Sequence, residues 1–253
     1  MQAIFDLIKQ KTIELDQAPI LQFVRDRSID PRQRFSFAPI MAAWAFGFAD
    51  INKFVLRDEG SQDPIQKVIN THTQEDDHHW GMYLRDMRTL GMNDATDFCS
   101  VIRLLWSDEA KKTRQTVYGL ISLIAAATPK LRLVIVEAIE AAGNTGLKGF
   151  VQAAEEFREA TGEKLVYFGD MHLDLESGHA MGTEDVEDKL QELTLTPEEE
   201  QQARTAIAKV FQLVSDMGDE YLAYAKKHPR TLPVPHLAAS QINQVVVRES
   251  QAK

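Results

Sequence analysis

The sequence predicts an all-α protein, a bundle of about seven to nine helices, and three observations support this prediction. Apolar residues recur at helical spacing between Pro and Gly breaks along the chain. Alternating β-branched runs bounded by Asn-Gly or Asp-Gly turns, which would indicate strands, are almost absent. The 253 residues, 44% of them hydrophobic and 26% charged, have an ordinary globular balance and suffice for one large core.

The expected helices follow these breaks in order. Two short helices are expected near residues 2–14 and 17–27, and a long apolar helix over about 32–57. Asp63 supplies an N-cap and Pro64 a first helical position for a helix that runs to Thr89. The remaining helices are expected at about 94–105, 108–127, 129–160 (kinked or divided at 143–146), 163–181 and, after a cap at Thr196, 197–227.

Residues 1–228 are expected to form a single helical-bundle domain, followed by a proline-containing tail over 229–253. We interpret the tail as a segment that can lie on a neighbouring subunit, as in a homodimer. The N-terminal residues indicate the start of an amphipathic helix and not a signal peptide. Cys99 is the only cysteine, so no intramolecular disulfide can form and the cytoplasm is the expected compartment.

Charge and hydropathy argue against two classes of partner. The most apolar stretch, residues 37–56, is interrupted by Asp50, Asn52 and Lys53, which favours a buried core helix over a membrane span. The net charge is −10, and Lys and Arg are scattered along the chain without a basic tract. We therefore expect neither a membrane nor a nucleic acid as partner.

Five of the seven His residues lie in two windows that share the spacing H-x3-[D/E]-x2-H. At about 100° per residue, positions i, i+4 and i+7 of a helix lie within roughly 60° of one another. Each window therefore projects two imidazoles and a carboxylate from one helical face. Chance would give roughly 0.03 such matches in a chain of this composition, so two matches indicate a shared chemical role. The two sets are His72, Asp76 and His79, and His172, Glu176 and His179.

Metal ligation explains this spacing. Imidazole and carboxylate together suit iron, manganese or zinc, and dinuclear sites in helical bundles collect such ligands from several helices. Glu137 and Glu140 interrupt an apolar helical face, where an unpaired charge would be unfavourable. One of these two residues is expected to face the metals.

These residues resemble the signature of the haem-oxygenase-like di-iron oxidases, whose fold is shared by TENA-like proteins. That signature has a Glu or His pair on one core helix, a Glu on a middle helix, and then H-x3-[D/E]-x2-H. The resemblance covers roughly residues 30–225, and it implies a haem-oxygenase-like bundle with two iron ions, or iron and manganese, and no haem. It also implies O2 activation and oxidation of a small organic substrate. The matching positions are His79, Glu140, His172, Glu176 and His179.

The chain departs from the family on the first core helix. Some members carry a Glu seven positions before the matched His, where this chain has His72, and others carry a Glu three positions before it, where this chain has Asp76. Asp76 is therefore the expected carboxylate ligand, with Glu75 as the alternative. His72 is either an additional ligand or orients Asp76 through a hydrogen bond, and we favour the orienting role.

Two other functions stay open at this point. One is a non-catalytic interaction protein, and the other is a cofactor-independent oxidase on the same fold that binds an organic ligand without iron. Asp50 is a candidate proton relay behind the ligands, and Cys99, with no nearby His, is expected to be a core residue. Trp44, Phe48 and Phe168 are candidates for the wall of a substrate pocket. His78 is expected behind the ligands or at the surface, and His228 and His236 in solvent.

Overall fold

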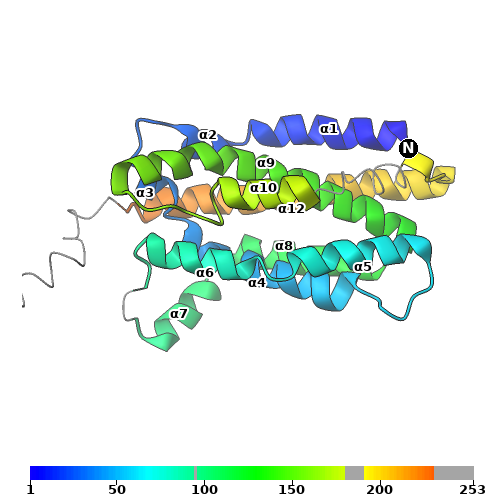
Figure 1. The fold of residues 1–253 in the computed structure, drawn as a ribbon, viewed down its shortest axis with the longest axis horizontal. Coiled ribbons are helices and arrows are strands. Elements are labelled where there is room, and N and C mark those ends of the chain that lie inside the picture. The colour runs from blue at the N-terminus through cyan, green and yellow to red at the C-terminus, as the bar shows by residue number, and fades with distance from the viewer. Residues whose placement is uncertain (94–95, 180–190, 231–253) are drawn as a thin grey trace, which may run out of the picture.

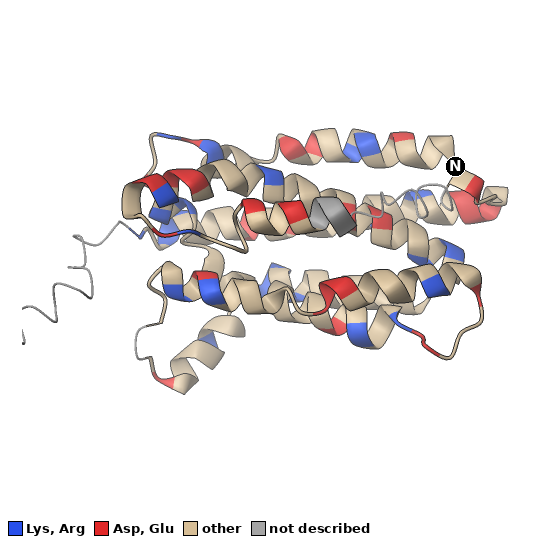
Figure 2. Ribbon diagram, viewed as in Figure 1, with Lys and Arg blue, Asp and Glu red and all other residues tan. Residues whose placement is uncertain are grey.

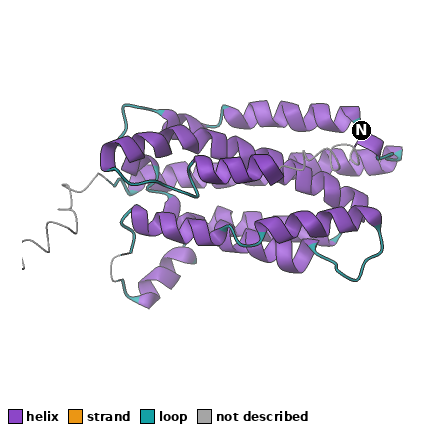
Figure 3. Ribbon diagram, viewed as in Figure 1, coloured by secondary structure: helices purple, strands orange, loops and turns teal. Residues whose placement is uncertain are grey.

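The computed structural model describes residues 1–93, 96–179 and 191–230, and for residues 176–179 it describes the backbone alone. Within these ranges all regular structure is helical, as predicted, and the helices form an elongated bundle (Figure 1; Figure 3). In chain order, the elements are α1 (Gln2–Asp16), α2 (Pro19–Arg25), α3 (Pro31–Arg34), the 3-10 turn η1 (Ala38–Met41), α4 (Ala42–Ile51), the π-helical turn η2 (Asn52–Leu56), α5 (Pro64–Asp76), α6 (Trp80–Thr89), α7 (Phe98–Leu105), the 3-10 turn η3 (Asp108–Ala110), α8 (Lys111–Ala125), α9 (Pro129–Thr161), α10 (Asp170–His179) and α12 (Pro197–Lys227).

Two helices begin where the sequence places a capping residue. The side chain of Asp63 accepts hydrogen bonds from the backbone N–H groups of Ile65 and Gln66, and Pro64 occupies the first position of α5. At the start of α12, Thr196 and Glu199 form a reciprocal capping box. Both predicted starts are confirmed, because the caps satisfy backbone donors that the helix itself leaves without partners.

Three predicted helices have different bounds in the structure. The stretch expected as one helix over 32–57 is divided, and Pro39 contributes to this because it lacks an N–H group and its ring clashes with a preceding carbonyl. The helix expected over 64–89 breaks at residues 77–79, and the one expected over 163–181 begins only at Asp170. By contrast, α9 is one continuous helix and is not divided at 143–146. Its packing against α1, α2 and α12 outweighs the weak helix propensity of the two glycines there.

The buried apolar side chains form two clusters that share the long helices α9 and α12. The first cluster lies among α1, α5, α8 and the first halves of α9 and α12. The second lies among α2, the segment 35–45, the second halves of α9 and α12, and residues 165–168. On α9 the change from one cluster to the other falls between Ala142 and Leu147, and on α12 between Leu213 and Met217.

Glycines allow α2 to approach both long helices closely at this junction. A Cβ atom at Gly149 of α9 would lie 2.8 Å from Cδ2 of Leu21, and one at Gly218 of α12 would lie 2.9 Å from Cγ2 of Ile20. Both distances are too short for real side-chain contacts. The absence of side chains at these two positions therefore sets how closely α2 packs beside the junction of the clusters.

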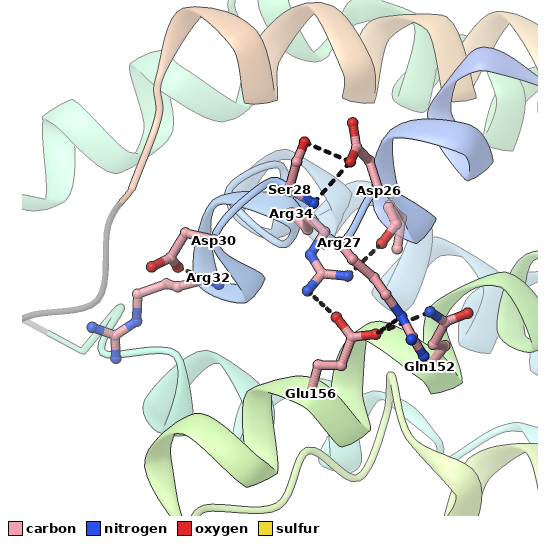
Figure 4. Close-up of polar contacts among 9 residues, drawn as sticks. Asp26, Arg27, Ser28, Asp30, Arg32, Arg34, Gln152 and Glu156 are labelled. Atoms are coloured by element: carbon pink, nitrogen blue, oxygen red, sulfur yellow. Dashed lines mark hydrogen bonds and ion pairs between the residues drawn. The ribbon is translucent and has the colours of Figure 1, made fainter.

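A partly buried ion pair connects α3 to α9 (Figure 4). Arg34 is 1% exposed, and its guanidinium contacts Glu156 at 2.5 Å and donates to the carbonyl oxygen of Val24 at 3.1 Å. The other carboxylate oxygen of Glu156 accepts from Arg27 and Gln152, at 3.0 and 2.9 Å. These contacts hold the turn between α2 and α3 against the second half of α9.

The short helix α7 lies outside both clusters and buries none of its residues. Cys99 is consequently exposed, and the prediction that it is a core residue is wrong. An apolar sequence did not reveal that this helix has few neighbours.

Figure 2 shows Lys and Arg interspersed with Asp and Glu along the described helices. None of these helices combines the length and the apolar character that crossing a membrane requires.

Candidate metal centre

Helices α5 and α9 bring one imidazole and two carboxylates together in the interior. His72 and Asp76 lie one turn apart on α5, Glu140 lies on α9, and none of the three is more than 7% exposed. Nε2 of His72 is 3.0 Å from Oδ2 of Asp76 and 3.3 Å from Oε1 of Glu140. One potential ligand atom from each residue lies within 4.8 Å of the other two, so this group can hold a metal ion.

Three polar atoms of this group, on His72 and Asp76, lack the hydrogen bonds that burial normally requires. Among the described residues, Nε2 of His72 and both carboxylate oxygens of Asp76 have no hydrogen-bond partner, because the short contact between them has unsuitable angles. A buried polar group without a partner destabilises a fold by about 1–3 kcal/mol, and a metal ion would serve all three atoms at once. The 3.0 Å contact between Nε2 of His72 and Oδ2 of Asp76 keeps the expected orienting role open beside that of a ligand. Nε2 of His72 is left as a potential ligand atom.

Two buried carboxylates this close together require a positive charge between them. Burial by itself lowers the pKa of His72, but the adjacent carboxylates of Asp76 and Glu140 outweigh this effect and raise the pKa to about 11. In the protein without metal, the imidazolium of His72 thus supplies the charge that balances Asp76 and Glu140. A bound cation would supply the same charge at the same place.

The helix that starts at Pro64 ends at Asp76, and residues 77–79 form a turn before α6. At this break Arg57 donates to the carbonyl oxygen of Thr73 at 2.7 Å and to the side chain of Asp77 at 2.7 Å. His79 consequently follows a turn and is the N-cap of α6. The prediction that His72, Asp76 and His79 share one stripe of a single helix is wrong for this reason.

His79 meets His172 of α10 in the interior. Nδ1 of His79 is 3.2 Å from Nε2 of His172, and both residues are buried. The carbonyl oxygen of Tyr167 lies 2.9 Å from Nδ1 of His172 and can only accept, so that nitrogen carries the proton and Nε2 of the neutral ring presents its lone pair. Two imidazole nitrogens that bind one ion at about 2.1 Å lie roughly 3.0–3.4 Å apart. The spacing of these two nitrogens therefore fits a shared ion.

One cavity of about 130 Å³ connects the two groups of potential ligands. Asp76, His79, Glu140 and His172 all line it, and it lies where the two apolar clusters meet. Most of its remaining wall is apolar, and no Lys or Arg is among the described residues that line it. Apolar side chains in the wall include Trp44, Phe48, Ile139, Leu147, Phe150 and Met217.

Gly143, one turn after Glu140 on α9, is exposed and also lines the cavity. A Cβ atom at Gly143 would meet no atom within 4 Å. Trp44 and Phe48 line the cavity as a stacked pair with ring centroids 5.2 Å apart. Phe168, the third aromatic residue considered for the pocket, is fully buried in the second cluster.

The remaining predicted site residues fall into three classes. Glu75 and Glu137 are half-buried and lie outside the group formed by His72, Asp76 and Glu140. Glu176 and His179 belong to the backbone of α10, so the helical spacing from His172 is present there, but their side chains lie outside the described residues. Asp50 is exposed on α4, and the prediction that it is a buried relay residue is wrong because the helix turns it to solvent.

Three other histidines were expected away from the site. His78 is exposed, as one of the two predicted locations required. The side chain of His228 is 41% exposed, as expected, although its ring packs on Tyr224 and its Nε2 lies 2.9 Å from Glu109. His236 lies outside the described residues.

Sequence reasoning missed one residue next to this site, Asp86. It is fully buried on α6, and its carboxylate accepts the backbone N–H groups of Val166, Tyr167 and Phe168 at 2.7, 2.8 and 3.0 Å. Burial raises the pKa of Asp86 to about 6, although the three backbone donors oppose the rise, so the group is ionised at neutral pH. Its position seven residues after His79, on the same face of α6, was the available signal.

Comparison of the chain with protein-family models gives no match, and comparison with curated proteins gives none. The ligand geometry and the motif spacing therefore carry the functional assignment.

Proposed function

We propose that this protein is a non-haem oxidoreductase of the haem-oxygenase-like type that holds two iron ions, or one iron and one manganese, and uses O2 to oxidise a small organic substrate. The observation that carries the proposal is the buried group of His72, Asp76 and Glu140, which shares one cavity with the His79–His172 pair. Three buried atoms of this group have no hydrogen-bond partner among the described residues, as expected for ligands.

The donor set favours iron or manganese. It combines imidazoles with carboxylates and contains no thiolate, whereas structural zinc sites commonly use Cys. His72, Asp76 and Glu140 would hold one ion and His79 with His172 the other, and the spacing along α10 assigns Glu176 and His179 to the same set. Glu140 lines the cavity between the two groups and is the residue suited to serve both ions.

Metal ions bound there would supply the redox chemistry with O2. The chain itself would hold the ligands in a cavity whose remaining wall is mostly apolar. A cavity of about 130 Å³ is close in size to an engineered apolar cavity of about 150 Å³ that binds benzene. Because no Lys or Arg is among its described lining residues, we infer that the part of the substrate inside it is uncharged and no larger than about one six-membered ring.

Anaerobic titration with Fe(II) tests the proposal. We expect saturation at two ions per chain, followed by consumption of O2 when the loaded protein is mixed rapidly with oxygenated buffer. Elemental analysis of well-folded protein that stays below one ion per chain would contradict the metal centre and favour an interaction protein. O2 uptake that needs an organic substrate but no metal would instead favour a cofactor-independent oxidase.

A large side chain at Gly143, an exposed residue that lines the cavity, is expected to obstruct the cavity without removing a ligand. In Gly143→Leu, the new side chain should lower the affinity for benzene, measured by NMR titration, at least about tenfold because it occupies the same apolar space. The variant should still bind two Fe(II) ions. Gly81→Leu is the matched control, since Gly81 is also an exposed helical glycine whose Cβ would meet no atom within 4 Å, but it does not line the cavity. Equal benzene affinity in the two variants would show that Gly143 does not border the binding space.

A further inference from the structure

The segment between α9 and α10 is held by a carboxylate from another helix. Asp86 of α6 accepts three consecutive backbone N–H groups, from Val166, Tyr167 and Phe168. The last of these donors belongs to the peptide unit that joins Tyr167 to Phe168. The carbonyl oxygen of that same peptide unit lies 2.9 Å from Nδ1 of His172.

A peptide unit is planar, and in the trans form its N–H and C=O point in opposite directions. The described chain contains no cis peptide bond, so this geometry applies between Tyr167 and Phe168. Asp86 therefore fixes one end of a rigid unit, and the other end receives the proton of His172. The carboxylate also polarises the peptide, which makes its carbonyl oxygen a stronger acceptor.

Metal-binding imidazoles commonly donate their second N–H to a carboxylate or carbonyl group, which fixes the tautomer and raises the basicity of the ligand nitrogen. In this protein the carbonyl of Tyr167 faces His172, and the carboxylate of Asp86 accepts the N–H at the other end of the same peptide unit. This arrangement leaves Nε2 of His172 as the lone-pair nitrogen, 3.2 Å from His79. His79 precedes α6, the helix that carries Asp86, so both partners of the pair depend on α6 for their positions.

We propose that Asp86 is a positioning residue for the metal centre, acting through the Tyr167–Phe168 peptide to hold His172 in the tautomer that binds metal. This inference rests on the proposed function for the identity of its target. The hydrogen bonds that run from Asp86 through the Tyr167–Phe168 peptide to His172 are present without a metal ion. The positioning role and the metal centre can therefore be tested separately.

A purely structural role for Asp86 makes a different prediction. If the carboxylate only anchors residues 166–168, its loss lowers stability and leaves the His172 ring unaffected. Stability alone therefore does not discriminate between the roles. The tautomer of His172 does, because a loss of global stability elsewhere in the bundle does not move a proton between its two ring nitrogens.

The experiment compares wild type, Asp86→Asn and Glu156→Gln, each labelled with 15N-histidine and free of metal. Long-range 1H–15N correlation spectra report the tautomer, and EPR titration with Mn(II) reports affinity. We expect wild type to hold His172 with the proton on Nδ1, and Asp86→Asn to populate both tautomers. We also expect Asp86→Asn to bind Mn(II) about 10–100-fold more weakly. Glu156→Gln weakens an ion pair of α9 outside the cavity and should leave both readouts unchanged.

An unchanged tautomer and Mn(II) affinity in Asp86→Asn would overturn the relay while leaving the metal centre in place. The expected tautomer change without Mn(II) binding in wild type would support the relay and contradict the metal centre. If Asp86→Asn does not fold, the wild-type spectrum still tests the relay. A His172 proton found on Nε2 would contradict it, because the carbonyl of Tyr167 needs the proton on Nδ1.

Discussion

Replacing Glu140 with alanine is expected to reduce Fe(II) binding from two ions per chain to one or fewer. Glu140 contributes the only carboxylate that α9 places in the cavity, 3.3 Å from Nε2 of His72. A site that has lost this ligand also loses half of the negative charge that faces His72. Helicity should stay nearly unchanged, because the two apolar clusters do not depend on this side chain. Elemental analysis and far-UV circular dichroism measure the two effects.

The control for this prediction is His228→Ala, which changes a histidine paired with Glu109 outside the cavity and should retain both ions. The same measurement on His72→Ala distinguishes the two roles considered for His72. We expect it to lose one ion, as Asp76→Ala should, because Nε2 of His72 lies 3.0 Å from Asp76 and 3.3 Å from Glu140, in the position of a third ligand atom. Retention of both ions in His72→Ala, with affinity lowered about 10–100-fold, would restore the orienting role. Equal metal content in wild type and Glu140→Ala would rule out Glu140 as a ligand.

Removing the carboxylate of Glu156 is expected to lower the free energy of unfolding by about 3–5 kcal/mol. The guanidinium of Arg34 is 1% exposed, and Glu156 is its ionic partner (Figure 4). In Glu156→Ala, this buried positive charge would keep the carbonyl oxygen of Val24 but lose its counter-charge. Urea denaturation followed by circular dichroism measures the change, and a constant m-value would show that the unfolded state is comparable.

Arg27→Ala is the matched control for this second prediction. Arg27 contacts the same carboxylate at 3.0 Å, but its side chain is 74% exposed, so water replaces the lost contact and the change should be much smaller. Similar midpoints for Glu156→Ala and Arg27→Ala would mean that Arg34 does not depend on Glu156 for its charge balance. Neither substitution should alter Fe(II) stoichiometry, because neither residue lines the cavity.

Local signals in the sequence were sufficient for the helical class and for several helix starts. Asp63 and Thr196 cap the helices that follow them, because a capping side chain bonds to backbone donors only two or three residues away. The His-x3-Asp spacing placed His72 and Asp76 together for the same reason, since one helical turn brings i and i+4 to one face. Glu140 was identified as one of two carboxylates in an apolar stretch, and the structure places it in the cavity.

Contacts between distant residues decided the rest. Where α5 ends, Arg57 bonds to the carbonyl of Thr73, and neither the hydropathy pattern nor the helix propensity of residues 64–89 contains that information. Asp86 reaches residues 166–168 from another helix, about 80 positions away in sequence, and so holds the peptide whose carbonyl contacts His172. Periodicity along one helix predicts which side chains share a face. Which carbonyl or carboxylate from another helix meets that face depends on tertiary packing, and that packing separated His79 from the stripe of His72 and brought it to His172.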